Sequence, residues 1–500
     1  MRKGYLLGID QSTQGTKALL FDSLGNLVCR ADRPHRQLIN EEGWVSHDLE
    51  EIYTNTIRVV KDVIERSGVD KRCLAGVGIS NQRETSAAWE RGTGRPLAAA
   101  IVWQCSRAKE ICGRIEKQGR AEEIRRATGL NLSPYFPASK FAWFLEHVEE
   151  IKRKSGEGKL CLGTMDSYLI YRLTGGKIFQ TDYSNASRTQ LFNIMDLAWD
   201  ENICGIFGIP MDALAVVCDS DSCFGETDFE GYLETPIPIH GVLGDSHGAL
   251  FGQGCLTRGM IKTTYGTGSS IMMNIGEKPV ISTHGVVTSL AWSMGGRVNY
   301  VLEGNINYTG AVITWMKEEL NLISSAAEAE ALARSANPED TTYLVPAFTG
   351  IGAPYWDSEA VGLITGITRR TGRAELVRAG LECIAYQIAD VIGAMSQDAG
   401  IAIEELRVDG GPTRNRYLMQ FQSDILGIGV LVPDAEELSG IGAAYAAGLA
   451  LGIYDQDIFT RMRRNGFDPE MDERVRNVKY AGWKEAVGKV LTGKALPTGV

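Results

Sequence analysis

The stretch GIDQSTQGTKALLFD, Gly8–Asp22, decides the fold that we expect for this chain. An apolar run ends at the carboxylate of Asp10, a series of small hydroxylated and glycine residues follows, and a second apolar run ends at Asp22. This pattern predicts two strands joined by a tight loop. Residues of this kind also form ordinary turns. The loop alone therefore leaves two interpretations open: a simple strand connection, or a concavity of backbone N–H groups that binds phosphate, with Asp10 holding a metal through water.

Length and composition exclude several classes of protein. A chain of 500 residues predicts two domains. Its net charge of −11 argues against nucleic acid or an anionic membrane as the main partner. Ten cysteines without a C-x-x-C pair are typical of reduced thiols in a cytoplasmic protein. In the first residues, MRKGYLLGID, the apolar run that Asp10 interrupts is too short for a signal peptide. The uncharged stretch Leu438–Tyr454 is too short to span a membrane. We expect that stretch to be a close-packed internal helix.

Two later loops repeat the first plan. The apolar run Met260–Thr264 leads into the loop YGTGSS, residues 265–270, and a second run, Ile271–Ile275, follows. Further on, a strand pattern leads into Asp409-Gly410-Gly411 and then into helical spacing. Open α/β sheets bind ligands beyond the carboxyl ends of their strands. We place a domain boundary in the glycine-rich stretch 251–259, which gives domains 1–254 and 255–500 with the ligand gripped between them.

The three glycine-rich loops together resemble those of the sugar kinase, hsp70 and actin superfamily. Seven motifs narrow the resemblance to the FGGY carbohydrate kinases, and among them to the glycerol kinases: NQRET (81–85), IVWQ (101–104), SPYF (133–136), DYSNASRT (182–189), GD (244–245), YGTG (265–268) and VPAFTG (345–350). The resemblance covers nearly the whole chain. It implies an α/β fold of two duplicated ribonuclease-H-like domains with ATP, Mg²⁺ and a small polyol in the interdomain cleft.

The resemblance also implies a set of residues for the acceptor. Transfer of a phosphoryl group to an alcohol needs a base for the hydroxyl proton, and the family resemblance makes Asp245 that base. It implies further that Arg83, Glu84, Tyr135 and Asp245 grip the hydroxyl groups while Trp103 covers the carbon backbone. An arginine beside a carboxylate suits vicinal hydroxyls, because one donates hydrogen bonds and the other accepts them.

A second set of residues is implied for the nucleotide. Asp10 resembles the magnesium-coordinating aspartate of the family, and Asp245 is the other carboxylate that we expect near the metal. The remaining nucleotide positions are Ser12, Thr13, Gln14 and Lys17 at the first phosphate loop, Thr267 at the second, and Gly310, Thr314, Gly411 and Asn415 on the adenosine side. Lys17 stands where the family commonly has Arg, and Thr314 where it often has Gln, so these two contacts depart from the family pattern.

Two departures concern the acceptor. Glycerol kinases commonly carry two Gln after the base and an aromatic after the second phosphate loop, whereas this chain has Ser246-His247 and Ser270. A smaller residue in the pocket wall leaves room for a longer or more hydroxylated substrate. Because the set Arg83, Glu84, Tyr135 and Asp245 is retained, we still expect glycerol, giving glycerol 3-phosphate, as the leading acceptor. A C4–C5 polyol or ketose is the alternative: erythritol, threitol, erythrulose, xylitol or xylulose.

Two other classes of function predict different sequences. A non-catalytic, filament-forming relative would lack the base and the polyol-binding set, and this chain has both. A dinucleotide-dependent dehydrogenase needs a G-x-G-x-x-G turn that opens a helix after the first strand, whereas the loop here leads into another strand pattern. We expect a cytoplasmic homodimer or homotetramer with no membrane anchor.

Overall fold

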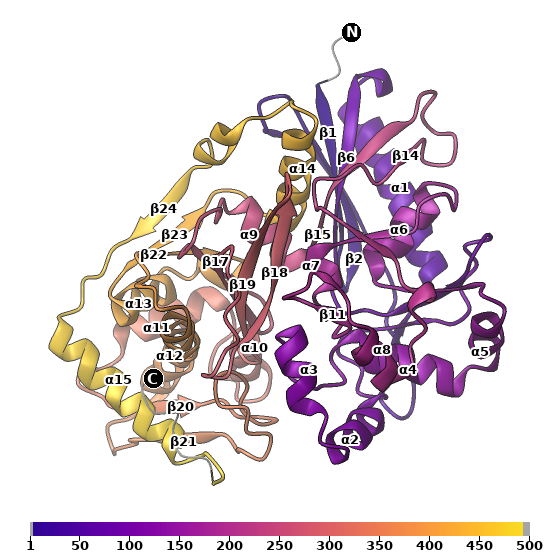
Figure 1. Cartoon of the computed structure of the whole chain (residues 1–500). Coiled ribbons are helices and arrows are strands. Elements are labelled where there is room, and N and C mark those ends of the chain that lie inside the picture. Colours follow the sequence, from indigo (N-terminus) through magenta and orange to yellow (C-terminus); the bar gives the residue numbers. More distant parts are fainter. Residues whose placement is uncertain (1–3, 494–500) are drawn as a thin grey trace.

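The computed structural model describes residues 4–493 and contains two mixed sheets built on one plan (Figure 1). The first sheet has the order β14-β15-β6-β1-β2-β3. Its strands are β1 (Tyr5–Gln11), β2 (Gly15–Phe21), β3 (Leu27–Pro34), β6 (Leu74–Asn81), β14 (Glu226–Thr227) and β15 (Ile237–Gly244). The central strand β1 runs antiparallel to β2 and parallel to β6.

The second sheet repeats this arrangement with different residues. Its order is β18-β19-β17-β16-β22-β23-β24. Its strands are β16 (Ile261–Tyr265), β17 (Ser269–Gly276), β18 (Val287–Met294), β19 (Arg297–Ile306), β22 (Glu405–Asp409), β23 (Gly429–Pro433) and β24 (Arg464–Phe467). Strand β16 takes the place of β1, because it runs antiparallel to β17 and parallel to β22. The predicted duplicated α/β fold is confirmed.

Helices cover both faces of each sheet. The helices of the first half of the chain are α1 (Leu49–Ser67), α2 (Lys109–Lys117), α3 (Ala121–Thr128), α4 (Pro137–His147), α5 (Glu149–Gly156), α6 (Met165–Leu173), α7 (Tyr183–Ala186), α8 (Glu201–Phe207) and α9 (Asp245–Gly252). Of these, α1, α6, α7 and α9 contact the first sheet, and the others pack against one another and against short strands outside it. The helices of the second half are α10 (Gly310–Glu318), α11 (Ala326–Ser335), α12 (Arg373–Ala399), α13 (Arg416–Leu426), α14 (Leu438–Ala450) and α15 (Glu473–Gly488). Short strand pairs such as β20 (Tyr343–Val345) with β21 (Leu363–Thr365) lie outside the two main sheets.

The sequence signals around the first sheet produce the expected elements. The quoted stretch forms the β1–β2 hairpin, whose register sets Lys17 directly opposite Asp10. Asp48 caps α1 by accepting hydrogen bonds from the next turn, and Gly68 ends the helix in the left-handed region. The apolar face of α1 packs against the sheet, where Ile52 and Val60 are fully buried.

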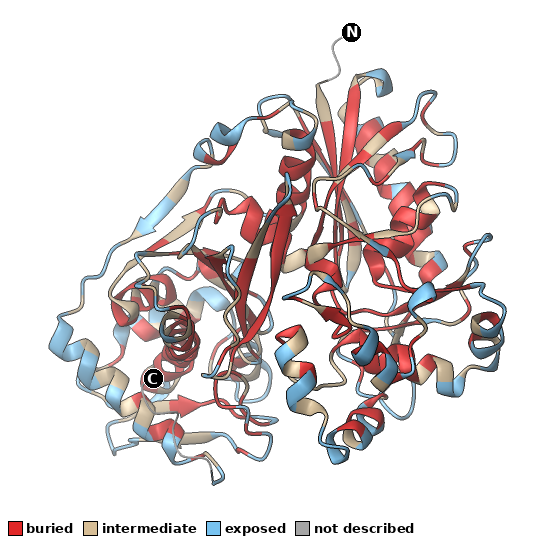
Figure 2. Cartoon of the chain, viewed as in Figure 1, coloured by how far each residue is buried: buried red, intermediate tan, exposed pale blue. Residues whose placement is uncertain are grey.

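Helices α9 and α14 cross between the two sheets (Figure 1). Although α14 comes from the second half of the sequence, it packs on β1, β6 and β15 of the first sheet. This contact is close: a Cβ on Gly78 of β6 would lie 2.1 Å from the carbonyl oxygen of Ala443. Leu438–Tyr454 thus contains the predicted close-packed helix, and α14 and the central strands of the two sheets are among the buried parts in Figure 2. The division of the chain at residue 254 stays a prediction.

Candidate active site

A cavity of about 740 Å³ lies where the carboxyl ends of the two central strands face each other. The first sheet contributes Asp10 and Lys17 to its wall, and the second contributes Thr264, Asp409 and Gly411. The cavity therefore brings together predicted nucleotide residues that lie about 400 positions apart in the sequence.

Asp10 has the properties of a carboxylate that needs a cation. It lies at the end of β1, only 5% exposed, and its Oδ1 has no hydrogen-bond partner among the described residues. Burial raises the pKa of Asp10 to about 6, against the attraction of Lys17, whose Nζ lies 3.9 Å from Oδ2. An unpartnered carboxylate oxygen suits Mg²⁺, which prefers oxygen ligands and keeps several of its waters. Within residues 4–493 no cluster of three or more His, Cys, Asp or Glu side chains could hold a metal, so the bound phosphates and water would supply the other ligands.

Lys17 is tied to the opposite side of the cavity by Glu437, the residue that precedes α14. Lys17 donates a short hydrogen bond to this carboxylate, and Arg30 Nη1 lies 2.8 Å from its other oxygen. Glu437 adopts a φ of 63°, a left-handed conformation that is uncommon for a residue with a side chain. Sequence reasoning did not find Glu437, whose ion pair with Lys17 keeps the Lys17 ammonium group at the wall of the cavity.

The first phosphate loop is a tight turn between β1 and β2. Ser12 donates hydrogen bonds to the carbonyl oxygen of Gly15 from its backbone N–H, at 2.9 Å, and from its hydroxyl, at 3.0 Å. Gln14 is exposed at the tip. Thr13 Oγ1 accepts a hydrogen bond of 2.9 Å from Nε1 of Trp103. The loop is therefore held against a residue predicted for the acceptor.

The second phosphate loop packs against the start of α10. The carbonyl oxygen of Gly266 accepts a hydrogen bond from the N–H of Gly310, and that of Thr267 accepts one from Ala311. Gly310 thus supports the loop from behind. Gly410 packs with a φ of 99° against Tyr265, the last residue of β16, and a Cβ on Gly410 would lie 2.0 Å from the carbonyl oxygen of Tyr265. Only glycine fits that position.

The residues predicted for adenosine have differing surroundings. Gly411 is exposed and lines the cavity. Asn415 is buried and caps α13, because its Oδ1 accepts a hydrogen bond from the N–H of Leu418. Thr314 is an exposed residue of α10, and of the four predicted positions Gly411 lines the cavity whereas Gly310, Thr314 and Asn415 do not.

Asp245 is the first residue of α9 and lies at the carboxyl end of β15. Its side chain is one-third exposed. Oδ1 accepts hydrogen bonds from the backbone N–H of Ser246, at 2.6 Å, and from Nε of Arg83, at 3.1 Å. Arg83 follows β6, the strand that pairs with β15, so parallel pairing brings the two side chains together.

Glu84 and Tyr135 lie beside this pair. Glu84 is buried at a φ of 58°, and Arg83 Nε lies 3.9 Å from its Oε1. Burial raises the pKa of Glu84. The Tyr135 and Trp103 rings are 5.5 Å apart between centroids and tilted at 59°. The structure therefore groups the residues predicted for the acceptor, with an aromatic wall on one side.

Three residues that sequence reasoning missed complete this group. Arg188 donates a hydrogen bond of 2.6 Å from Nε to Glu84 Oε1, and Glu303 of β19 binds both Arg83 and Arg188. Lys140 of α4 donates to the carbonyl oxygens of Glu84, at 3.4 Å, and of Tyr135. Arg188 lies within the motif DYSNASRT, which was the available signal, whereas no sequence pattern marked Glu303 or Lys140.

Ser246 and Ser270 approach each other across the two halves. The Ser270 hydroxyl donates to Ser246 Oγ at 3.3 Å. His247 is fully buried, and both of its ring nitrogens lack hydrogen-bond partners among residues 4–493. Burial holds the pKa of His247 well below its usual range, so the ring is neutral. Ser246 and Ser270 thus form a small, hydroxylated part of the pocket wall, as expected from the absence of an aromatic residue at position 270.

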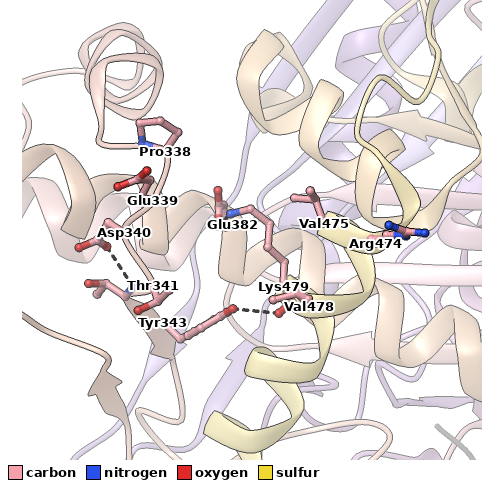
Figure 3. Close-up of a pocket in the computed structure, with 11 residues that line it drawn as sticks. Pro338, Glu339, Asp340, Thr341, Tyr343, Glu382, Arg474, Val475, Val478 and Lys479 are labelled. Atoms are coloured by element: carbon pink, nitrogen blue, oxygen red, sulfur yellow. Dashed lines mark hydrogen bonds and ion pairs between the residues drawn. The ribbon is translucent and has the colours of Figure 1, made fainter.

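A second cavity, of about 310 Å³, lies on the outside of the second half, between α12, α15 and the segment 338–343 (Figure 3). Glu382 of α12, Tyr343 and Lys479 of α15 line it, and the Tyr343 hydroxyl donates to the carbonyl oxygen of Lys479. None of the residues predicted for the site is in its wall. It is therefore separate from the cleft.

Comparison with known proteins agrees with this geometry. Residues 5–252 match the FGGY family of carbohydrate kinases, N-terminal domain, and residues 261–451 match the C-terminal domain of the same family. The chain belongs to the FGGY family of carbohydrate kinases. This FGGY kinase is 48% identical to glycerol kinase 1 of Thermotoga maritima, over 98% of this chain and all of that protein. It is 47% identical to the glycerol kinase of Symbiobacterium thermophilum, over 97% and 98% of the two chains.

Solved structures share the whole architecture of this FGGY kinase. The glycerol kinase of Plasmodium falciparum, crystallised with ADP, superimposes with a TM-score of 0.92 at 35% identity, covering 98% of this chain and 99% of that one. A xylulose kinase from Lactobacillus acidophilus gives 0.87 at 20% identity over 97% of both chains, which shows the fold alone. No helix within residues 4–493 is both long and apolar enough to cross a membrane.

Proposed function

We propose that this FGGY kinase transfers the γ-phosphoryl group of ATP to a terminal hydroxyl of glycerol and forms glycerol 3-phosphate. The observation that carries the proposal is the Asp245–Arg83–Glu84 group beside the Trp103–Tyr135 wall, connected by Thr13 to the first phosphate loop. Full-length similarity to glycerol kinases supports the choice of acceptor.

In this proposal Asp245 is the general base. The acceptor hydroxyl attacks the γ-phosphorus, its oxygen–phosphorus bond forms while the bond to ADP breaks, and the hydroxyl proton passes to Asp245. Oδ1 already accepts two hydrogen bonds, so we assign the proton to Oδ2. Arg83 and Glu84 orient the other hydroxyls, and Trp103 and Tyr135 cover the carbon chain.

We assign the nucleotide to the cavity between the two sheets. Asp10 would hold Mg²⁺ together with Asp245, whose negative charge helps to raise the pKa of Asp10. The metal supplies charge neutralisation on the phosphates. Ser12, Thr13 and Lys17 would contact phosphate from the first half and Thr267 from the second, while Gly310, Gly411 and Asn415 form the adenosine side. Gln14 at the tip of the first loop and Thr314 of α10 are the other two members of the proposed nucleotide set, and both are exposed.

A second acceptor class is favoured by one observation. Ser246 and Ser270 form a small, polar contact at the site, and such a wall suits an extra hydroxymethyl group. A C4–C5 polyol or ketose (erythritol, threitol, erythrulose, xylitol or xylulose) is therefore the alternative acceptor.

A coupled ATP-consumption assay on the purified protein tests both acceptors. It measures kcat/KM for glycerol and for a panel of C3–C6 polyols and ketoses. A tenfold or greater preference for glycerol supports the first proposal, and a preference for a tetritol or pentitol supports the second. Absence of turnover with every member contradicts both.

We also propose a cytoplasmic homodimer or homotetramer. All ten cysteines lie within the described residues and none forms a disulfide, in keeping with a reducing compartment. Light scattering of the purified protein tests the oligomeric state.

A further inference from the structure

A buried network of alternating charges joins the two halves of the chain beside Asp245. Arg83 donates two hydrogen bonds of 2.8 Å, from Nη1 and Nη2, to the two carboxylate oxygens of Glu303. Arg188 Nη1 lies 2.8 Å from Glu303 Oε2, and Arg188 Nε donates to Glu84. The two guanidiniums and the carboxylates of Glu84 and Glu303 are each at most 5% exposed.

The network crosses from one half of the chain to the other. Arg83 and Arg188 belong to the first half, whereas Glu303 belongs to β19 in the second sheet. Nη1 and Nη2 of Arg83 are thus held by Glu303 of the second half, whereas Nε donates a hydrogen bond of 3.1 Å to Asp245. An arginine side chain stays charged when buried, so its position depends on where its carboxylate partners are.

We propose that Glu303 is a positioning residue for phosphoryl transfer, which fixes Arg83 between the acceptor and Asp245 and makes that geometry depend on contact between the two halves. The inference rests on the proposed function. Without the Glu303 carboxylate, Nη1 and Nη2 of Arg83 would turn toward Asp245, which is the nearest remaining carboxylate. The base would then be held in a two-pronged ion pair, and the acceptor would lose a hydrogen-bond donor.

The test compares Glu303→Gln, which keeps the shape but removes the charge, with Glu303→Asp, which keeps the charge but shortens its reach. Glu382→Gln is the matched control, because Glu382 is also a buried, ion-paired glutamate of the second half but lies at the outer cavity. Kinetics are measured for acceptor and ATP, and ADP binding is measured by calorimetry.

We expect Glu303→Gln to raise the acceptor KM and lower kcat, so that kcat/KM falls about 10- to 100-fold, with ADP binding unchanged. Glu303→Asp should recover part of this loss, and Glu382→Gln should behave as wild type. The inference is overturned if Glu303→Gln keeps wild-type kinetics, or if ADP and acceptor binding weaken alike in both Gln variants, as a merely structural role requires. If Glu303→Gln does not fold, Glu303→Asp is the deciding variant. A lower kcat/KM for the acceptor with unchanged ADP binding then supports the inference, and an equal weakening of acceptor and ADP binding overturns it. A wild type that phosphorylates no polyol would overturn the proposed function as well, and the wild-type assay separates that case.

Discussion

A Cβ atom on Gly442 of α14 would lie 1.9 Å from the carbonyl oxygen of Gly248 in α9. The Cβ would be fixed to the backbone of α14 and the oxygen belongs to the backbone of α9, so neither can move aside without separating the helices. Because α9 begins at Asp245 and α14 follows Glu437, this crossing fixes the proposed base relative to the residue that binds Lys17.

Gly442→Ala should therefore destabilise the protein by about 1–3 kcal/mol through overpacking. Urea unfolding, followed by circular dichroism, measures the change. Gly113→Ala is the control: Gly113 is also inside a helix, α2, but a Cβ there has no neighbour within 4 Å. The control should gain about 0.5–1 kcal/mol, because alanine favours helix. Equal unfolding midpoints for the two variants would contradict the role of this crossing.

Asp245→Asn tests the proposed base. The amide has nearly the same shape but cannot accept the hydroxyl proton, so kcat should fall about 10²- to 10⁴-fold. Calorimetry should show unchanged ADP binding. Asp212→Asn, at an exposed carboxylate of the same half, should leave kcat unchanged. Wild-type turnover in Asp245→Asn would remove Asp245 from this role.

The sequence predicted the parts of the site that lie at the ends of strands. The first hairpin, the second phosphate loop and Asp409-Gly410-Gly411 each follow an apolar run, and local patterning suffices to locate them. The helix within Leu438–Tyr454 was also recognisable from its small residues, but the sheet that it covers was not. Which sheet the helix covers depends on close approach of the backbones of residues far apart in the sequence, such as Gly78 and Ala443.

Contacts between distant side chains were beyond sequence reasoning. Arg83 and Glu303 are 220 positions apart, and a single glutamate within a strand gives no sign of its partner. The adjacent pair Arg83-Glu84 was predicted as one unit, yet each side chain has its closest ion-pair contact with another residue, Glu303 and Arg188 respectively. Pairing of charges is decided by the tertiary fold, which brings second-half carboxylates to first-half arginines.

Lys140 should make stability depend on pH. It is fully buried, and burial lowers its pKa from 10.5 to about 7. Between these pH values the unfolded chain binds a proton that the folded chain does not, so the free energy of unfolding rises with pH across this window. Relative to Lys140→Met, the wild type should gain about 2 kcal/mol between pH 7 and pH 9. Urea unfolding of both proteins at several pH values measures this difference, and parallel curves would show that Lys140 keeps its ordinary pKa.

Ser270→Phe tests whether the pocket wall sets acceptor size. Ser270 is half-buried on β17 and its hydroxyl donates to Ser246, so a phenyl ring there would occupy space beside Asp245 and displace this polar contact. The ratio of kcat/KM for glycerol to that for a tetritol or pentitol should rise about 10-fold or more, because a longer acceptor loses room that glycerol does not use. Ser270→Ala is the matched control, since it removes the hydroxyl without filling the space, and it should change the ratio much less. The ratio is measured with the same coupled assay for wild type and both variants. An acceptor ranking that stays the same in Ser270→Phe would mean that this wall does not contact the acceptor, and the preference would then have to be set by Arg83, Glu84 and Tyr135 alone.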